Sequence, residues 1–489
     1  MSELYDLVLI GGGPAGYVGA IRAAQLGHKV ICVERDALGG TCLNWGCIPT
    51  KALIAGAEMY HQVKHEAAKW GITTGEVSYD WSKIIGRSRT VAGNLNKGIG
   101  FLFKKNKITH VMGHAHISNP KMGCCDGAER KFEIAVYDAA DSARTGAVKQ
   151  TITAKNILIA TGAGPRELPG TPFDGDKIIS SKQAMNLPEQ PKSLLVLGSG
   201  AIGMEFAYFY NAFGTKVTVV EMQDRVLPIE DNDVSKVVEK AFTKSGITLL
   251  TGHTTKSIEK TATSVIALVA KADGSGEQLI EADKLLVAIG VAGRYDGLFE
   301  DSLGIKTERG FIVTDYKQEH PTYATSVPGI YAVGDIIGPP WLAHVASEEA
   351  VTCVERIFGA HAHDVDYSSI PGCTYCEPQV ASIGLTERAC KEQNLDIVIG
   401  TFPLAASGKA QAMGSTDGFV KMISDKKTGE ILGCHMVGHG VTELIAEICL
   451  ARKLEATVDE VIATMHAHPT LSEGVHEAAL GTDGRMIHA

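Results

Sequence analysis

The sequence of 489 residues has no long apolar run, no dense set of cysteines and no basic excess. No stretch approaches the roughly 18 uninterrupted apolar residues of a membrane-spanning helix. The 11 cysteines are sparse and irregularly spaced, which excludes a secreted disulfide framework and favours a reducing compartment. A formal charge of −10 argues against nucleic acid or an anionic membrane as a partner.

The length of the chain exceeds what one hydrophobic core usually serves, so we expect roughly two to four domains. A strand-like run, Tyr5 to Ile10, begins almost at once, with no secretory or Arg/Ser-rich transit segment ahead of it. We therefore expect a bacterial cytoplasmic protein, or the mature form of a protein of an organelle matrix.

Two segments repeat one design: an apolar strand, a glycine-rich turn, a helix, and a second strand that ends in glutamate. The first contains Gly11-Gly-Gly-Pro-Ala-Gly16 and ends at Glu34, and the second contains Gly198-Ser-Gly-Ala-Ile-Gly203 and ends at Glu221. The same number of residues separates the first glycine from the glutamate in both. The order and spacing match the dinucleotide-binding fingerprint.

In this fingerprint the glycines let the backbone approach a pyrophosphate at a helix N-terminus, and the carboxylate accepts hydrogen bonds from ribose hydroxyls. Two units therefore predict two dinucleotides. One unit could instead be a structural relic, but a packing turn has no need of the glutamate. Glu221 would repel a 2′-phosphate, which favours NAD over NADP at the second site. The expected contacts in the loops are Gly11, Gly13, Pro14, Ala15 and Gly16, and Gly198, Gly200, Ala201, Ile202 and Gly203.

The remaining segments also carry recognisable patterns. Residues 118 to 155 predict an antiparallel excursion, after which strand-like residues 156 to 160 lead into Thr161-Gly162. A strand over residues 329 to 333 ends at Gly334-Asp335, where a carboxylate could bind a cofactor hydroxyl. After about residue 356, strands and an amphipathic helix predict a separate α+β domain. Apolar side chains recur at helical spacing in that helix, at Val441, Leu444, Ile445, Ile448 and Cys449.

The segment from Gly39 to Lys51 contains two cysteines, Cys42 and Cys47, separated by four residues. We expect them at the start of a helix that continues to Gln62, where the helix dipole stabilises a thiolate. Lys51, one turn beyond Cys47, would project from the same helix face. The pair is therefore predicted to be redox-active, although two buried structural thiols are the alternative.

The other cysteines point to no metal site. Cys373 and Cys376 form a C-x-x-C, but no second ligand pair stands at zinc spacing, so we expect core packing and no metal. Cys124 and Cys125 fall in a polar loop and are expected to be exposed.

Near the C-terminus, the segment His466-Ala-His468-Pro-Thr-Leu-Ser-Glu473 resembles a base whose second ring nitrogen is held by a carboxylate. A surface hydrogen bond is the ordinary interpretation of such a pair. A dithiol reaction requires a base for thiol deprotonation, and this favours catalysis by His468.

Together these motifs resemble the pyridine nucleotide-disulfide oxidoreductases, and within them the dihydrolipoamide dehydrogenase branch, over nearly the whole chain. The resemblance rests on both glycine loops, residues 40–51, Ala160-Thr-Gly162, Glu205, Gly334-Asp335, Leu342-Ala-His344 and residues 468–473. It implies an α/β fold with two Rossmann-like dinucleotide-binding domains and a C-terminal α+β dimerisation domain. The implied domains are 1–163 for FAD, 164–291 for NAD, 292–355 completing the FAD site, and 356–489 at the dimer interface.

The resemblance also implies a role for each site residue. Cys42 would exchange disulfides with the substrate, and Cys47 would lie against the flavin. His468, oriented by Glu473, would act on the thiol pair of the other subunit of a homodimer, and Lys51 would pair with Glu205 near the flavin. Contact positions for FAD would be Glu34, Ala115, Thr161, Gly162 and Asp335, and those for NAD would be Gly198, Gly200, Gly203, Glu221 and Gly290. Further cofactor-binding positions would be Gly40, Thr41, Cys42, Lys51 and Ala343.

The implied activity is oxidation of protein-bound dihydrolipoamide to lipoamide with NAD⁺, as part of 2-oxoacid dehydrogenase or glycine cleavage complexes. Lipoyl domains of acyltransferases, or H-proteins, would be the partners. The chain departs from the family at Val291-Ala-Gly-Arg-Tyr295, which puts the nicotinamide-side contacts in doubt. Two alternatives remain: a glutathione-reductase-like enzyme that uses NADPH, against which Glu221 argues, and a flavoprotein subunit with a mainly structural role.

Overall fold

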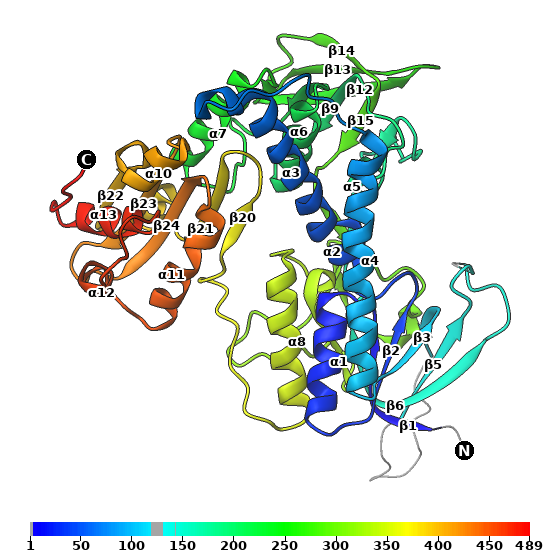
Figure 1. Cartoon of the computed structure of the whole chain (residues 1–489). Helices are drawn as coiled ribbons and strands as arrows, with labels where there is room; N and C mark the ends of the chain where they lie inside the picture. Colours follow the sequence, from blue (N-terminus) through cyan, green and yellow to red (C-terminus); the bar gives the residue numbers. More distant parts are fainter. Residues whose placement is uncertain (1–2, 119–130, 142) are drawn as a thin grey trace. The chain divides into compact units, whose positions relative to one another are not determined.

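The computed structural model describes residues 3–118, 131–141 and 143–489 (Figure 1). The chain forms two compact units. The first unit comprises Met1–Ala52, Gly86–Arg166 and Gly290–Val365, and the second comprises Leu53–Ile85, Glu167–Ile289 and Asp366–Ala489.

A parallel sheet with the strand order β3-β2-β1-β6-β19 lies at the centre of the first unit. Its strands are β1 (Leu4–Ile10), β2 (Val30–Glu34), β3 (Thr109–Met112), β6 (Gln150–Ile159) and β19 (Ile330–Ala332). Leu7 of β1 is in register with Val30 of β2 and with Asn156 of β6. Strands β1 and β2 are largely buried on both faces, as parallel strands usually are, whereas the edge strand β3 is mostly exposed.

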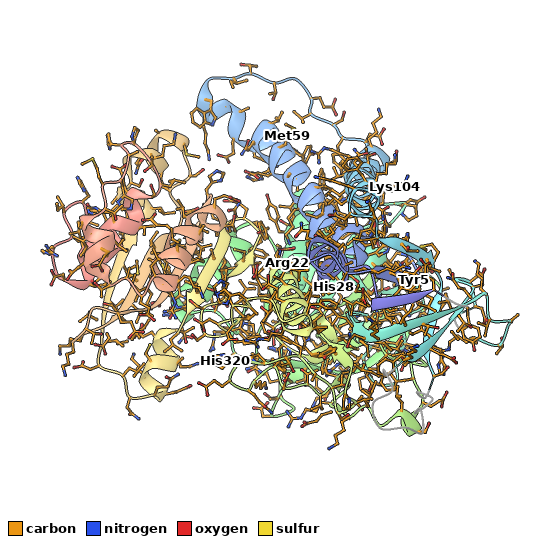
Figure 2. All side chains as sticks on the ribbon, turned by 90° about the horizontal axis from the view of Figure 1, so that it is seen from below. Tyr5, Arg22, His28, Met59, Lys104 and His320 are labelled. Carbon is orange, nitrogen blue, oxygen red and sulfur yellow. The ribbon has the colours of Figure 1, made fainter. Side chains whose placement is uncertain are left out.

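Helices α1 (Pro14–Gln25) and α8 (Ala343–Ile357) lie side by side in this unit (Figure 1). A Cβ atom at Gly19 would lie 3.3 Å from the Leu9 side chain and 3.4 Å from Ala350, so α1 packs closely between β1 and α8. Arg22, labelled in Figure 2, donates a 2.8 Å hydrogen bond from Nε to Oε1 of Glu355 in α8. Small residues on α1 thus allow the close helix approach.

The excursion predicted after the first repeat is antiparallel. Strands β4 (His114–Ile117) and β5 (Phe132–Tyr137) pair with each other, and β5 pairs with the first half of β6. Buried and half-buried residues alternate along β5, as expected for a strand with one covered face. Cys124 and Cys125 lie outside the described residues.

Three helices carry or follow the cysteine motif. The short α2 (Gly40–Trp45) ends at Gly46, and α3 (Cys47–His61) begins immediately after it. Helices α3 and α4 (Trp81–Lys105) each belong partly to both units. Shorter elements are η1 (Gln62–Glu66), η2 (Ala67–Trp70), β7 (Ala163–Pro165), β16 (Val291–Gly293), η3 (Asp301–Leu303), β17 (Thr307–Glu308), β18 (Phe311–Ile312) and η4 (Gly334–Ile337).

The second unit contains another parallel sheet, with the strand order β11-β10-β9-β15-β8. Its elements are β8 (Ile178–Ile179), α5 (Ser181–Ala184), β9 (Ser193–Leu197), α6 (Ala201–Ala212), β10 (Lys216–Val220), α7 (Asn232–Lys244), β11 (Thr248–Leu250) and β15 (Lys284–Val287). An antiparallel meander of β12 (His253–Lys260), β13 (Val265–Lys271) and β14 (Gln278–Ala282) is inserted before β15. The second predicted repeat is therefore confirmed.

The C-terminal part of this unit is an antiparallel sheet with the order β20-β21-β24-β23-β22. Its strands are β20 (Gly372–Thr374), β21 (Gln379–Gly384), β22 (Ile397–Pro403), β23 (Phe419–Asp425) and β24 (Ile431–Gly438). Its helices are α9 (Glu387–Glu392), η5 (Leu404–Ala406), α10 (Gly408–Met413), α11 (Val441–Lys453), α12 (Val458–Ala463) and α13 (Glu473–Thr482). Val441, Ile445 and Ile448 of α11 are buried in its core, as their spacing predicted.

The predicted fold class, two Rossmann-like units with a C-terminal α+β domain, is confirmed. The four sequence-derived domain boundaries remain a prediction. Among the described residues, no helix is both long and apolar enough to cross a bilayer.

Candidate redox and dinucleotide site

The first glycine loop joins β1 to α1 and packs very closely on itself. Gly11 has φ +103°, a conformation that favours glycine, and a Cβ there would lie 2.3 Å from the carbonyl oxygen of Ala160. A Cβ at Gly16 would lie 1.8 Å from the carbonyl oxygen of Gly11. Gly13 caps α1, Pro14 begins it and Ala15 follows, and no side chain caps the helix. The first backbone N–H groups of α1, which no side chain caps, are suited to an anionic group.

Glu34, at the end of β2, is buried and holds this loop. Its Oε2 accepts a hydrogen bond from the backbone N–H of Gly12 at 2.6 Å, and its Oε1 accepts one from Asp36 at 2.7 Å. Gly40 also approaches the loop, since a Cβ at Gly40 would lie 2.6 Å from the Cα of Gly13. Gly40 and the exposed Thr41 form the first turn of α2, so the cysteine motif starts beside the glycine loop.

The second glycine loop joins β9 to α6 and repeats this geometry. Gly198 has φ +97°, and a Cβ at Gly203 would lie 2.0 Å from its carbonyl oxygen. The buried Glu221 accepts hydrogen bonds from Ser199 N and Oγ, both at 2.8 Å, and from Gln223 N at 2.8 Å. Open space surrounds Gly200, and Ala201 and Ile202 of α6 are exposed, so this loop is accessible to a ligand.

Other predicted cofactor positions gather at the strand ends of the first unit. Ala115 is buried in β4, and Thr161 and Gly162 lie just beyond β6, after Ala160. The buried Oγ1 of Thr161 has no hydrogen-bond partner among the described residues, which fits a ligand group at this place. Ala343 begins α8, and the exposed Gly290 accepts a hydrogen bond from the Arg166 N–H at 3.0 Å.

Asp335 is set in η4, after β19. Burial raises the pKa of its carboxyl group to about 6, against the opposing charge of Arg294. The backbone N–H of the preceding Gly334 donates a 2.7 Å hydrogen bond to the buried carboxylate of Glu349 on α8. Sequence analysis missed both Glu349 and the role of Arg294, because neither belongs to a local motif.

Cys42 and Cys47 both occur as thiols, on two helices rather than at the start of one. Gly46 separates the helices, because its backbone is not helical, with φ −147° and ψ −118°. The hydrogen bond from Cys42 to Cys47 raises the pKa of the Cys42 thiol, burial raises it further, and the positive charge of Lys51 opposes both. The hydrogen bond and burial thus favour the protonated form of Cys42.

Polar side chains fix the loop that carries this thiol pair. The amide of Asn44 donates hydrogen bonds to the carbonyl oxygens of Leu38 at 2.9 Å and Gly40 at 3.0 Å. Arg89 on α4 donates to the carbonyl oxygen of Asn44 at 2.6 Å and lies over the ring of Trp45. The thiols are thus positioned by a well-connected loop.

Lys51 lies in the first unit and Glu205 in the second. Lys51 is half-buried on α3 and close enough to Cys42 for its charge to act on the thiol. Glu205 is buried on α6, where Oε1 accepts a 3.0 Å hydrogen bond from the backbone N–H of Tyr375. Their predicted pairing remains a prediction.

His468 and Glu473 lie together in the second unit. Nδ1 of His468 is 2.8 Å from Oε1 of Glu473, and the backbone N–H of Thr470 donates to Oε2 at 2.9 Å. This N–H and the His468 ring lower the pKa of Glu473. A carboxylate can only accept, so Nδ1 carries the proton and Nε2 is available as a base. The His468 side chain is 78% exposed.

The neighbouring histidine and the C-x-x-C have structural surroundings. The His466 side chain is 7% exposed and binds Glu447 through Nε2 at 2.7 Å. Cys373 packs against the C-terminal core and Cys376 is buried, which agrees with core packing.

Comparison with known proteins agrees with this geometry. Residues 5–350 match the family described as pyridine nucleotide-disulphide oxidoreductase, and residues 370–479 match its dimerisation domain. The chain belongs to this family. The second match also supports a homodimer.

Similar proteins narrow the class. A dihydrolipoyl dehydrogenase of Rhizobium etli is 46% identical over 490 residues and covers 100% of both chains. One of Bacillus subtilis is 41% identical over 489 residues, again over 100% of both. The crystal structure of LpdA from Mycobacterium tuberculosis has a TM-score of 0.86 at 28% identity, covering 97% of this chain and 99% of that one.

Proposed function

We propose that this chain is a dihydrolipoyl dehydrogenase, a homodimer that oxidises protein-bound dihydrolipoamide with NAD⁺. The observation that carries this proposal is the Cys42–Cys47 thiol pair beside the first of two dinucleotide loops. The full-length similarity to dihydrolipoyl dehydrogenases supports the same activity.

The loops of the first unit would hold FAD. The α1 amides offer an anion site, and Glu34 offers a carboxylate fixed by the loop. Thr161 adds a buried hydroxyl group without a partner among the described residues, and Asp335 adds a buried carboxyl group. The second glycine loop and Glu221 would hold NAD. When bound, FAD accepts two electrons from the thiol pair and passes them to NAD⁺ as a hydride.

The sulfur chemistry belongs to the chain itself. A thiolate of the substrate attacks Cys42 in the oxidised pair, breaks the Cys42–Cys47 bond and releases Cys47 as a thiolate. The second substrate thiolate then attacks its own mixed-disulfide sulfur, expels Cys42 and leaves as the cyclic disulfide. Both electrons remain on the enzyme thiols. The raised pKa of Cys42 favours protonation of that thiol, so Cys47 would carry the negative charge.

His468 would supply the base. Nε2 of His468 of the partner subunit would accept the proton of the first substrate thiol and release it to solvent. It would then accept the proton of the second thiol and deliver it to the expelled Cys42 thiolate, while Glu473 stabilises the imidazolium. Lys51 provides positive charge beside the thiols, and Glu205 would be its counter-charge between the two cofactors.

The physiological substrates would be the lipoyl groups of acyltransferase components or H-proteins in 2-oxoacid dehydrogenase or glycine cleavage complexes. A bacterial cytoplasm or an organelle matrix is the proposed location, in agreement with the bacterial relatives.

Steady-state kinetics on the purified holoenzyme test the proposal. We expect NAD⁺ reduction by dihydrolipoamide, and its loss in both Cys42→Ser and Cys47→Ser with flavin retained. Faster oxidation of NADPH by glutathione disulfide would favour the glutathione-reductase-like alternative. Full activity in either cysteine variant would reject the thiol mechanism.

A further inference from the structure

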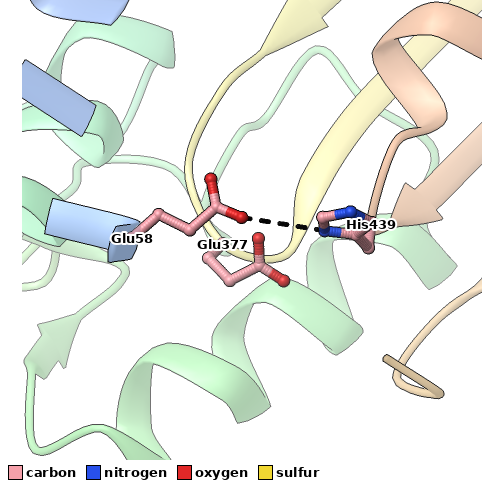
Figure 3. Close-up of side chains that lie close together, drawn as sticks. All are labelled: Glu58, Glu377 and His439. Carbon is pink, nitrogen blue, oxygen red and sulfur yellow. Dashed lines mark ion pairs between the residues drawn. The ribbon is translucent and has the colours of Figure 1, made fainter. Parts of the chain in front are cut away.

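Three side chains that the redox chemistry does not use converge in the second unit. Glu58 lies on α3, Glu377 follows β20, and His439 follows β24 (Figure 3). One ligand atom from each lies within 4.8 Å of the other two. Oε1 of Glu58 is 3.9 Å from Nδ1 of His439, too far for a direct hydrogen bond. The two carboxylates and the imidazole therefore face a shared space rather than pair tightly.

The charges around this space are unbalanced. Within the described residues, Glu377 makes no hydrogen bond or ion pair, although its side chain is half-buried. The negative charges of Glu58 and Asp417 act on the carboxyl group of Glu377, so like charges are gathered at this space. The same two glutamates also raise the pKa of Tyr208 on α6, after burial, so its phenol lies close to them. One imidazole shares this space with two carboxylates, and a cation would relieve the repulsion between the carboxylates.

We propose that Glu58, Glu377 and His439 bind a divalent transition-metal cation, of which Zn²⁺ is the representative probe. One imidazole nitrogen and two carboxylate oxygens are a ligand set that Zn²⁺ accepts, with water in the fourth position. Binding would draw the donors inward, because zinc–nitrogen and zinc–oxygen bonds are about 2.0–2.2 Å long. Mg²⁺ would bind poorly, because it prefers oxygen ligands and a hydrated octahedral shell.

Binding would join segments of the second unit that are distant in the sequence. The three ligands come from a helix and two loops, so the cation would tie α3 to the turns after β20 and β24. The thiol pair is not required for binding, since the three ligands contain no sulfur. The site is therefore separable from the redox reaction.

Zinc binding to the metal-free, fully oxidised holoenzyme tests the proposal, because the closed Cys42–Cys47 disulfide cannot ligate metal. Calorimetry should show a site that Glu377→Gln and His439→Gln each weaken at least tenfold. His361→Gln and Glu392→Gln remove exposed groups of the same kinds and should leave that site unchanged. Mg²⁺ should not displace the zinc.

Crystals of the zinc-soaked holoenzyme provide the second measurement. An anomalous difference peak between Glu58, Glu377 and His439 is expected at the zinc edge, and it should disappear in His439→Gln. Flavin content and dimer mass identify any variant that misfolds. Glu58→Gln then replaces that variant in the binding test, and the anomalous peak in the wild-type crystal shows whether zinc occupies the site. No peak at these side chains, or equal zinc affinity in folded variants and wild type, would overturn the proposal.

Discussion

Glu221 should set both the affinity for NAD⁺ and the preference for NAD⁺ over NADP⁺. Glu221→Gln keeps the shape of the side chain but removes its charge and one of its two acceptor oxygens. The carboxylate accepts hydrogen bonds from Ser199 and Gln223, so the amide must face at least one donor. Losing one charge-assisted hydrogen bond costs about 1.5–3 kcal/mol, which corresponds to roughly 10- to 100-fold in kcat/KM for NAD⁺.

The same change should relax the coenzyme preference. Two unit charges about 4 Å apart interact with about 4 kcal/mol at an effective dielectric constant of 20. This energy corresponds to roughly 1000-fold, which is an upper bound on the discrimination against a 2′-phosphate. We therefore expect the ratio of kcat/KM for NAD⁺ and NADP⁺ to fall at least about tenfold in Glu221→Gln.

Glu34→Gln is the matched control, because Glu34 has the same position in the first glycine loop. It should weaken flavin retention and leave the coenzyme ratio of the flavin-loaded fraction unchanged. A ratio that is unchanged in Glu221→Gln, or equally changed in Glu34→Gln, would refute the assignment of the second loop to NAD.

Three further predictions concern the base, a glycine and a buried acid. Glu473→Gln should lower kcat with dihydrolipoamide by about 100-fold at normal flavin content, because His468 loses the charge that stabilises its imidazolium; unchanged kcat would contradict this role. Gly16→Ala should destabilise the fold by about 3 kcal/mol and reduce bound flavin in the purified protein, because its methyl group would lie 1.8 Å from a carbonyl oxygen. Gly93→Ala on α4 places its methyl group in open space and should change neither stability nor flavin content. Burial raises the pKa of Asp335 from 3.8 to about 6, so the folded apoprotein binds more protons than the unfolded chain between these pH values. The free energy of unfolding should therefore fall by about 3 kcal/mol as pH rises through this interval. Urea unfolding should show a weaker pH dependence in Asp335→Asn, and an identical slope would count against the buried-acid interpretation.

The features predicted correctly from the sequence are those written in local spacing. Each glycine loop, its helix and its terminal glutamate lie within one short segment, so the pattern predicts the structure around Gly11 and Gly198. The pair His468 and Glu473 is similarly local, and the structure further distinguishes the exposed His468 from the enclosed His466.

The features missed from the sequence depend on distant contacts or on one backbone angle. Glu349 supports the turn at Gly334 from another element, and no spacing rule relates the two. The ligand candidates Glu58, Glu377 and His439 are brought together only by the fold. The helical break at Gly46 escaped prediction because glycine in a helical pattern is compatible with either a continuous or a broken helix.

The path of the electrons can be tested by reducing the oxidised holoenzyme with one equivalent of dihydrolipoamide in the absence of oxygen. The mechanism requires two electrons to pass through Cys42 and Cys47 to the flavin. The account predicts that the thiol pair becomes titratable and that a long-wavelength absorbance band appears, which Cys47→Ser lacks. Appearance of the same band in Cys47→Ser, or flavin reduction while the disulfide stays closed, would contradict the account.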